Sequence, residues 1–543
     1  MKRSAQTTTA ITSRTDPLEP RNLLSAWRWW LGPAALSLAL ALLFRDPFIG
    51  DWDALDYTVL ALRGQPSSMA LGRSLFIFFN HGLWRAADAL FHLPAADAYL
   101  LFKYAVVLQC PLAVLACWTL ARDLVRSREA ATIAALLVAT SPAFVVYGGQ
   151  VMTEIPSILL LSVALTVHLR GVRSGRVWMI VVGAALLGLG VNVRETVAFY
   201  APWLVVAPFL CGPIKVEGRR KTLLAVLASI VFLVFAFGPF AVWFASDAGF
   251  RASWYGWRES MRAESARHPV ALINALPFLL YFFLAAPLVF SALPLAFAKE
   301  WRERGPKCLL ALALVGLFAN LLLIFNYSTV VNWRYFLTGL PALAPLAASW
   351  LLRWRAAKRG DTRRAFLSIV LAIICVTAAL GIYAQVAARV YFERRVLTRD
   401  YIARLSLLPR DSVVIAGGQT VAVTYYRGIG AGQWDAIGTG GGWPGAQLVP
   451  TIETYLQQGR RVFLDTDTRW WSVCGWQAEE TRAIVALESR FRFRRVSDTI
   501  FELRPPGDNT AHDAPNLQSL LAENRPADVK RCAGSGRMKG NVE

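Results

Sequence analysis

Three aspartates within six residues form the first group in this chain that can do chemistry. Asp51, Asp53 and Asp56 stand in the stretch GDWDALDY at positions 50–57. On a helix, Asp53, Asp56 and Tyr57 occupy positions i, i+3 and i+4, so two carboxylates and a phenol share one side. We expect the three aspartates to supply catalytic acids or bases and Tyr57 to bind substrate.

The same stretch also fits an ordinary helix start. Asp53 as the N-cap would begin a helix over 54–63 that stops at Gly64, and Asp56 in the first turn favours the positive end of the helix dipole. A cap needs only one acid. Three acids in one short stretch therefore favour a site over capping alone, although capping by itself still explains Asp53.

Three later places bring ionisable groups to the ends of apolar runs. They are Glu154 in MTEIP, Arg194 with Glu195 in VNVRET, and Arg334 with Tyr335 in NWRYF. Ionisable groups near membrane depth are costly and are functional candidates by default. Glu154 as a first-turn acid, and Arg194 with Glu195 as a plain connection between two spans, are the alternatives. We expect all five residues to bind substrate.

Carboxylates and arginines together indicate one kind of reaction. An aspartate can take a proton from an attacking hydroxyl, and a guanidinium can hold a phosphate through two hydrogen bonds. The combination suits a transfer in which a nucleophile loses its proton while a phosphate leaves.

The elements that must position these residues are membrane spans. The chain has 543 residues, of which 55% are hydrophobic and only 17% charged, whereas soluble domains carry about 25% charged residues. The net charge of +21 is spread over alternate loops and not over one face, so we expect no nucleic-acid partner.

Apolar runs long enough to cross a bilayer predict about eleven transmembrane helices. Lys and Arg gather in alternate loops, which places the N-terminus in the cytoplasm and the C-terminal part outside. All four candidate places then lie at the outer face. The predicted divisions are a cytoplasmic tail over 1–26, a membrane domain over 27–390, and long outer loops over 45–98 and 246–273. The expected spans are 27–44, 99–121, 130–148, 153–169, 177–193, 196–211, 222–245, 274–297, 308–326, 336–352 and 365–388.

Residues 391–505 read as a small extracytoplasmic α/β domain. The segments DSVVIAGG, VAVTYYR, RRVFLDTD and TIFELRP are typical of strands, and VPTIETYLQQG and AEETRAIVALESR of helices. The polar tail over 506–543 is expected to be disordered.

The seven cysteines give no disulfide framework or metal-binding spacing. Five of them fall in apolar segments, where a thiol behaves as a small hydrophobe. Cys474 and Cys532 are the two that lie outside, where they could pair with each other.

The order of these motifs resembles a known family. GDWDALDY with ALRGQP, then GRSLFIFFNHGLWRAADALF, MTEIP, VNVRET and NWRYFLTGLPALAPL resemble the GT-C membrane glycosyltransferases, in particular the group of protein O-mannosyltransferases and bacterial lipid A aminoarabinose transferases. The resemblance covers about residues 27–390. It implies that a sugar passes from a polyprenyl-phosphate donor to a lipid, glycan or protein acceptor at the outer face, usually with inversion.

The resemblance also implies roles for single residues. The family usually has Asp-Glu in the first loop, and Asp53 matches the aspartate that acts as base, but Ala54 stands where the glutamate is expected. Asp51 or Asp56 would then be the second acid. Glu154 matches the acid of the second outer loop, and Arg194 and Arg334 match positions that suit the lipid phosphate.

No cofactor is required by this reading, because the departing phosphate carries its own charge away. Some relatives use a divalent cation held by paired carboxylates, and Asp51 with Glu154 would be its ligands here. The competing functions are a transporter or flippase of polyprenyl-linked glycans and a membrane-anchored glycan assembly or binding protein. The Arg- and Ala-rich composition suggests a bacterial inner membrane.

Overall fold

The computed structural model describes the parts of the chain that form helices, strands and their short connections. These parts are residues 27–45, 52–212, 218–267, 275–303, 307–326, 333–373, 375–376, 403, 405–415, 420–430, 432–437, 445–466 and 477–507. The tail over 1–26, Asp51, and the cysteines Cys474 and Cys532 lie outside the described residues, as does the C-terminal tail from 508 onward.

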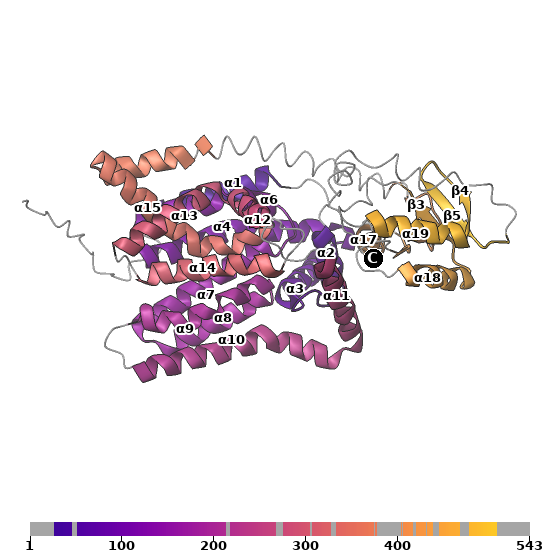
Figure 1. The fold of residues 1–543 in the computed structure, drawn as a ribbon, viewed down its shortest axis with the longest axis horizontal. Helices are drawn as coiled ribbons and strands as arrows, with labels where there is room; N and C mark the ends of the chain where they lie inside the picture. Colours follow the sequence, from indigo (N-terminus) through magenta and orange to yellow (C-terminus); the bar gives the residue numbers. More distant parts are fainter. Residues whose placement is uncertain are drawn as a thin grey trace, which may run out of the picture.

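A helical bundle accounts for most of the described chain (Figure 1). Most of its helices lie side by side along one direction. The elements before the sheet are α1 (Trp27–Leu43), α2 (Trp52–Arg63), α3 (Ser74–Phe91), η2 (Ala95–Asp97), α4 (Ala98–Val125), α5 (Arg128–Ala139), α6 (Pro142–Gly148), α7 (Glu154–Ser174), α8 (Val177–Val191), η3 (Glu195–Tyr200), α9 (Ala201–Leu210), α10 (Gly218–Ser246), α11 (Ala248–Arg267), α12 (Ala275–Ala285), α13 (Pro287–Arg302), α14 (Lys307–Asn326), η5 (Trp333–Gly339) and α15 (Leu340–Arg359).

Each expected span from 27 to 352 corresponds to one helix or to two consecutive helices. Among the described residues, four helices are long and apolar enough to cross a membrane, and the number rises to six if each of two bent pairs is one span. The bends, of 61° between α5 and α6 and 107° before Pro287, fall at the short breaks between consecutive helices. The total of eleven spans stays a prediction.

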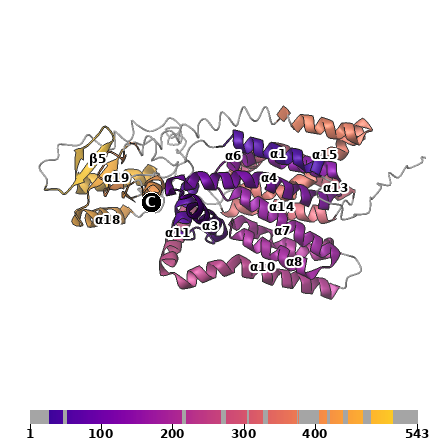
Figure 2. The ribbon, with the colours of Figure 1, turned by 180° about the vertical axis from the view of Figure 1, so that it is seen from behind.

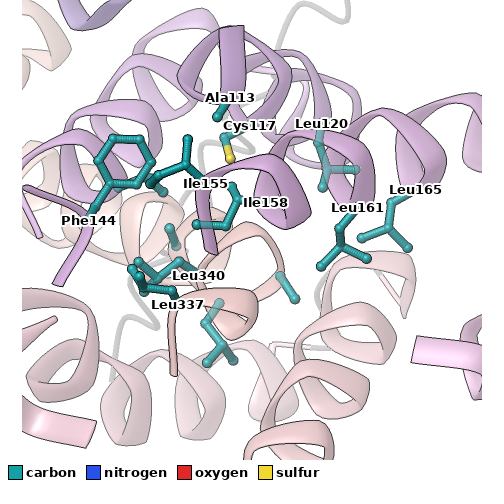
Figure 3. Packing of buried hydrophobic residues seen from close by; sticks show 14 of the residues in the cluster. Ala113, Cys117, Leu120, Phe144, Ile155, Ile158, Leu161, Leu165, Leu337 and Leu340 are labelled. Carbon is teal, nitrogen blue, oxygen red and sulfur yellow. The ribbon is translucent and has the colours of Figure 1, made fainter. Parts of the chain in front are cut away.

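The core of the bundle lies between α4, α6, α7, η5 and α15. Because these helices are apolar on several sides, they pack against one another and leave little polar surface inside. Figure 3 shows this core, with labelled residues Ala113, Cys117, Leu120, Phe144, Ile155, Ile158, Leu161, Leu165, Leu337 and Leu340. Here Cys117 is a buried thiol, as expected of a small hydrophobe.

The prediction of no disulfide was wrong for one pair. Cys211, which follows α9, forms a disulfide with Cys308 in the first turn of α14. The two cysteines are 97 residues apart in the sequence. No local spacing could reveal the pair, because the packing of α9 against α14 brings the two thiols together.

The C-terminal part contains a five-stranded sheet of order β2-β1-β3-β5-β4. Strands β1, β2 and β3 are parallel, and β5 is antiparallel to both β3 and β4. Helices α18 and α19 cover one face through a shared hydrophobic cluster. The elements are β1 (Val413–Ile415), α17 (Thr420–Gly428), β2 (Asp435–Ile437), α18 (Gly445–Gln457), β3 (Val462–Asp465), α19 (Gln477–Arg490), β4 (Arg492–Arg495) and β5 (Ile500–Arg504).

One strand prediction in this region was wrong, because VAVTYYR forms the helix α17. Ala422, Tyr425 and Gly428 recur at helical spacing, and α17 packs along α2. Tyr425 meets Tyr99 edge-on, and Gly428 faces Val59 so closely that a Cβ at this position would lie 3.2 Å from Cγ2 of Val59. Tertiary packing thus overrides the strand preference of these valines and tyrosines.

Figures 1 and 2 show where these parts lie relative to one another. Helices α2, α3 and α11 gather at one end of the bundle, and α10 runs along the bundle towards α11. The sheet with α18 and α19 lies beyond the same end. The bundle end that carries α2 is therefore where the segment after α1 and the C-terminal part meet.

Candidate active site

Helix α2 brings the first two acids to the end of the bundle. It starts at Trp52, so Asp53 lies in its first turn and is not the cap. Gly64 has a φ of +62°, the left-handed conformation that ends a helix, as predicted. Ala54, Leu55 and other apolar residues of α2 are buried, whereas Asp53 and Asp56 are only partly buried. The amphipathic helix therefore holds the two carboxylates at the edge of the packed core.

An unbroken line of charge contacts joins all four of the places predicted from the sequence. Arg334 donates from Nη2 to Oδ2 of Asp53 over 2.7 Å, and its Nε lies 3.6 Å from Oε1 of Glu154. Arg194 donates from Nη1 to the same Glu154 oxygen over 2.6 Å and to Thr153 over 2.9 Å. The structure thus brings Asp53, Glu154, Arg194 and Arg334 into one site.

Burial differs along this line. The Arg194 and Glu154 side chains are only 2% and 1% exposed, whereas Arg334 and Asp53 are 14% and 25% exposed. Glu154 is the first residue of α7 and Arg334 lies in η5, at the entry to α15. The inner pair is sealed in the bundle, and the outer pair faces the accessible side of the site.

Tyr335 lies against both arginines. Its ring centre is 5.2 Å from the Arg194 guanidinium carbon and 5.3 Å from that of Arg334. An aromatic face at this distance attracts a cation. Tyr335 therefore positions the two guanidiniums relative to each other.

A second ion pair includes a residue that the sequence reasoning missed. Arg73 donates to both carboxylate oxygens of Glu195, over 3.3 and 3.0 Å, and lies 5.4 Å from the centre of the Tyr57 ring. Tyr57 is itself buried and meets Phe76 edge-on, so its ring is held in place against the Arg73 guanidinium. Arg73, like Arg194, is an ionisable residue at the end of an apolar run. The sequence therefore contained the signal that could have identified Arg73.

The two acids of α2 have opposite electrostatic surroundings. Burial would raise the pKa of Asp53, but the positive charges of Arg334 and Arg73 outweigh it and hold the pKa below its ordinary value. Burial and the neighbouring charge of Asp53 raise the pKa of Asp56 to about 6. At neutral pH both are ionised, but Asp56 binds a proton far more readily. Asp51 lies outside the described residues.

Several buried polar atoms of the site have no hydrogen-bond partner among the described residues. They are Oε2 of Glu154, Nε and Nη2 of Arg194, and Oγ1 of Thr196, which follows Glu195. Unpaired buried polar groups are costly, so such atoms are suited to hold a polar ligand or water.

The described residues contain no group of three or more His, Cys, Asp or Glu side chains that could hold a metal ion. Glu154, one of the two carboxylates considered for a cation, is engaged by two guanidiniums. A carboxylate in that setting suits arginine better than a divalent cation, since both of its contacts are already positive.

Comparisons with known proteins agree with this architecture. Residues 89–243 match the family described as dolichyl-phosphate-mannose-protein mannosyltransferase. ArnT from Cupriavidus metallidurans, crystallised with undecaprenyl phosphate, is similar at a TM-score of 0.54 and 14% identity over 88% of this chain and 98% of that one. The apo oligosaccharyltransferase of Archaeoglobus fulgidus is similar at 0.50 and 13% identity, over 89% and 75% of the two chains. No curated protein sequence matches the chain.

Both solved structures cover nearly the whole chain, and the family match lies within the bundle, from α3 into α10. The two neighbours are GT-C glycosyltransferases, as the order of motifs in the sequence predicted. The chain is therefore a multi-pass membrane protein with the GT-C fold, and its resemblance to the group of O-mannosyltransferases and aminoarabinose transferases is confirmed.

Proposed function

We propose that this protein is a membrane glycosyltransferase that moves a sugar from a polyprenyl-phosphate donor to an acceptor hydroxyl at the outer face, with inversion. The observation that carries the proposal is the line of contacts from Asp53 through Arg334 to Glu154 and Arg194. It places a carboxylate, which can accept a proton, beside guanidiniums that can hold a phosphate. The undecaprenyl phosphate in the ArnT structure supports this class of donor.

In the proposed reaction Asp53 is the general base. The acceptor oxygen attacks the anomeric carbon, its proton passes to Asp53, and the bond from that carbon to the phosphate oxygen breaks. Asp53 is held by Arg334 in the free protein, where its pKa is low. When a phosphate enters and draws the Arg334 charge towards itself, Asp53 becomes a stronger base. Donor binding would thus prepare the base.

The roles that we propose for the arginines follow from the exposure of their side chains. Arg334, which reaches the accessible side, pairs with the phosphate of the departing carrier. Arg194 is buried against Glu154 and is a positioning residue, because it fixes the carboxylate that contacts Arg334. Arg73 adds a further positive charge that acts on both Asp53 and Asp56. Because guanidiniums supply this charge, we propose that no metal ion is required.

The proposal includes the predicted topology. The N-terminus is cytoplasmic, and α2 and the sheet lie on the outer face of a bacterial inner membrane. The 391–505 region, of which the described residues form the sheet and its helices, is then extracytoplasmic.

The experiment is a transfer assay with the purified protein and a labelled polyprenyl-phosphate sugar. Donors carrying hexoses and pentoses are compared, and turnover of the carrier is measured for the wild type, Asp53→Asn and Arg334→Ala. We expect both variants to lose at least 99% of the activity, because general bases and charge-stabilising groups each contribute about 10²-fold or more. Glu259→Gln, on exposed α11, is the matched control. Full activity of Asp53→Asn would remove Asp53 as the base, and no turnover with any donor would favour transport or binding.

A further inference from the structure

One edge of the sheet carries a row of arginines that the transfer site does not use. The strand register places Arg492 opposite Arg504, and Leu503 opposite Val462, so Arg461 stands next to Arg504. The three residues lie at the same end of β4, β5 and β3. A continuous line of guanidiniums therefore crosses three neighbouring strands.

Two carboxylates hold this row in place. Glu502 is 1% exposed and receives hydrogen bonds or ion pairs from Arg461, Arg494 and Arg504. Asp435 does the same for Arg427 and Arg460. Since each carboxylate neutralises only one charge, both clusters keep an excess of positive charge in a fixed geometry.

The row ends at a cavity of about 520 Å³ lined by Arg410, Arg427, Gly430, Gly432 and Gln433. Its wall is fixed, because the backbone N–H of Gln433 donates to the carbonyl of Arg410 over 2.9 Å. The cavity adjoins the end of α17, whose Gly428 lies against Val59 of α2. A ligand bound along these arginines would thus end next to α17 and α2, the helix pair that connects the sheet to Asp53 and Asp56.

The charge balance of the whole surface is strongly positive. Among the residues that the structure describes there, seven arginines stand against three carboxylates, namely Arg410, Arg427, Arg460, Arg461, Arg492, Arg494 and Arg504 against Asp411, Asp435 and Glu502. Arg410 and Arg492 are exposed and form no ion pair with any residue that the structure describes. Guanidiniums in fixed positions bind carboxylate and phosphate groups through paired hydrogen bonds.

We name the surface formed by these seven arginines the arginine row. We infer that the arginine row binds an extended anionic glycan whose sugars carry carboxylates. Its length across three strands fits a chain, and the cavity accommodates the end of that chain. Phe463 under Arg461 is buried, and Tyr455 under Arg460 is only partly exposed, so the surface offers little aromatic surface on which bases could stack. The choice of a glycan rests on the outer location given in the proposed function.

Binding is tested directly with the purified full-length protein at low salt. The probe is an oligogalacturonate of about ten sugars, compared with a neutral maltooligosaccharide of the same length and with a single-stranded oligonucleotide. We expect the uronate to bind at least tenfold more tightly than the neutral chain and the oligonucleotide, and its affinity to fall as salt is added.

The informative variant is Arg410→Gln with Arg492→Gln, since it removes two charges from the ends of the row and breaks no ion pair among the described residues. We expect the dissociation constant for the uronate to rise at least fivefold. The matched control is Arg262→Gln with Arg495→Gln, which removes two exposed arginines outside the row and should change the constant less than twofold.

Three results would overturn the inference: equal binding of the uronate and the neutral chain, equal or tighter binding of the oligonucleotide, or an unchanged constant in the Arg410/Arg492 variant. Asp53→Asn separates this inference from the proposed function. It should abolish transfer and leave uronate binding unchanged, so a failure of transfer in the wild type would not affect the binding result.

Discussion

At the scale of single residues, burial separates two arginines that look alike in the sequence. Arg194 and Arg334 both stand at the ends of apolar runs, yet Arg194 is sealed beside Glu154 and Arg334 reaches the accessible side of the site. A buried carboxylate that loses its partner is left as an uncompensated charge, which costs more than the loss of an exposed pair. The two arginines should therefore differ in what their removal does.

Arg194→Ala is expected to lower the free energy of unfolding by about 3 kcal/mol, because Glu154 then keeps only its longer contact to Arg334. Thermal unfolding of the purified protein measures the change. Arg262→Ala, on exposed α11, should have almost no effect. The double variant Arg194→Met with Glu154→Leu should recover much of the loss, since it removes both buried charges. A melting temperature for Arg194→Ala equal to that of the wild type would contradict the assigned role.

The pH profile decides which acid of α2 is the base. A base acts only when it is deprotonated. The pKa of Asp53 is below its ordinary value, whereas that of Asp56 is raised to about 6. If Asp53 is the base, kcat/KM stays level as the pH falls from 8 through 6. If Asp56 is the base, it falls about tenfold per pH unit below 6.

We expect the level profile, with Asp56→Asn keeping the shape of the wild-type curve. An acid limb near pH 6 that disappears in Asp56→Asn would transfer the role of base to Asp56. Circular dichroism at each pH serves as the control, because it separates loss of activity from loss of fold.

At the scale of elements, local patterns predicted the helices and helix ends, because these features depend on residues that are neighbours in the sequence. Apolar runs indicated the helices of the bundle, and Gly64 marked the end of α2. The β-branched and aromatic residues of VAVTYYR predict a strand, whereas its helix packs on α2, a segment more than 350 residues away in the sequence. The partnership of Arg73 with Glu195 and the Cys211–Cys308 disulfide were hidden for the same reason.

The packing of α17 on α2 gives a prediction about the position of the acids on α2, and not about their chemical role. A Cβ at Gly428 would lie 3.2 Å from Cγ2 of Val59, which is tighter than ordinary contact. Gly428→Val should therefore push α2 away and lower kcat about tenfold or more, since small displacements of catalytic groups are costly. The transfer assay measures kcat, and binding of the labelled donor is measured alongside it.

The matched control for this change is Gly256→Val in α11, where a Cβ meets no atom within 4 Å. It should leave kcat unchanged. If Gly428→Val were as active as the wild type, the C-terminal part would have no influence on the acids of α2.

At the scale of the whole molecule, the fold fixes which parts share a side of the membrane. Helix α10 starts at the basic residues Arg219, Arg220 and Lys221 and ends beside α11, at the bundle end where α2 and the sheet lie (Figure 1). With 29 residues, α10 is long enough to cross a bilayer. If α10 crosses the membrane, the basic start of α10 and the C-terminal sheet lie on opposite sides, and from the positive-inside rule we expect the sheet outside.

This orientation predicts the labelling of cysteines placed at two exposed positions. A membrane-impermeant maleimide should label Arg495→Cys, in β4, in cells whose outer membrane is permeabilised and whose inner membrane is intact. It should label Arg219→Cys only after the inner membrane is opened. The wild-type chain shows the background from its own cysteines, and transfer activity of each variant shows that the fold is kept. The reverse pattern would place α2, Asp53 and the sheet in the cytoplasm, where a reaction on an outer acceptor has no access. Labelling of both positions from one side would mean that α10 does not cross the membrane.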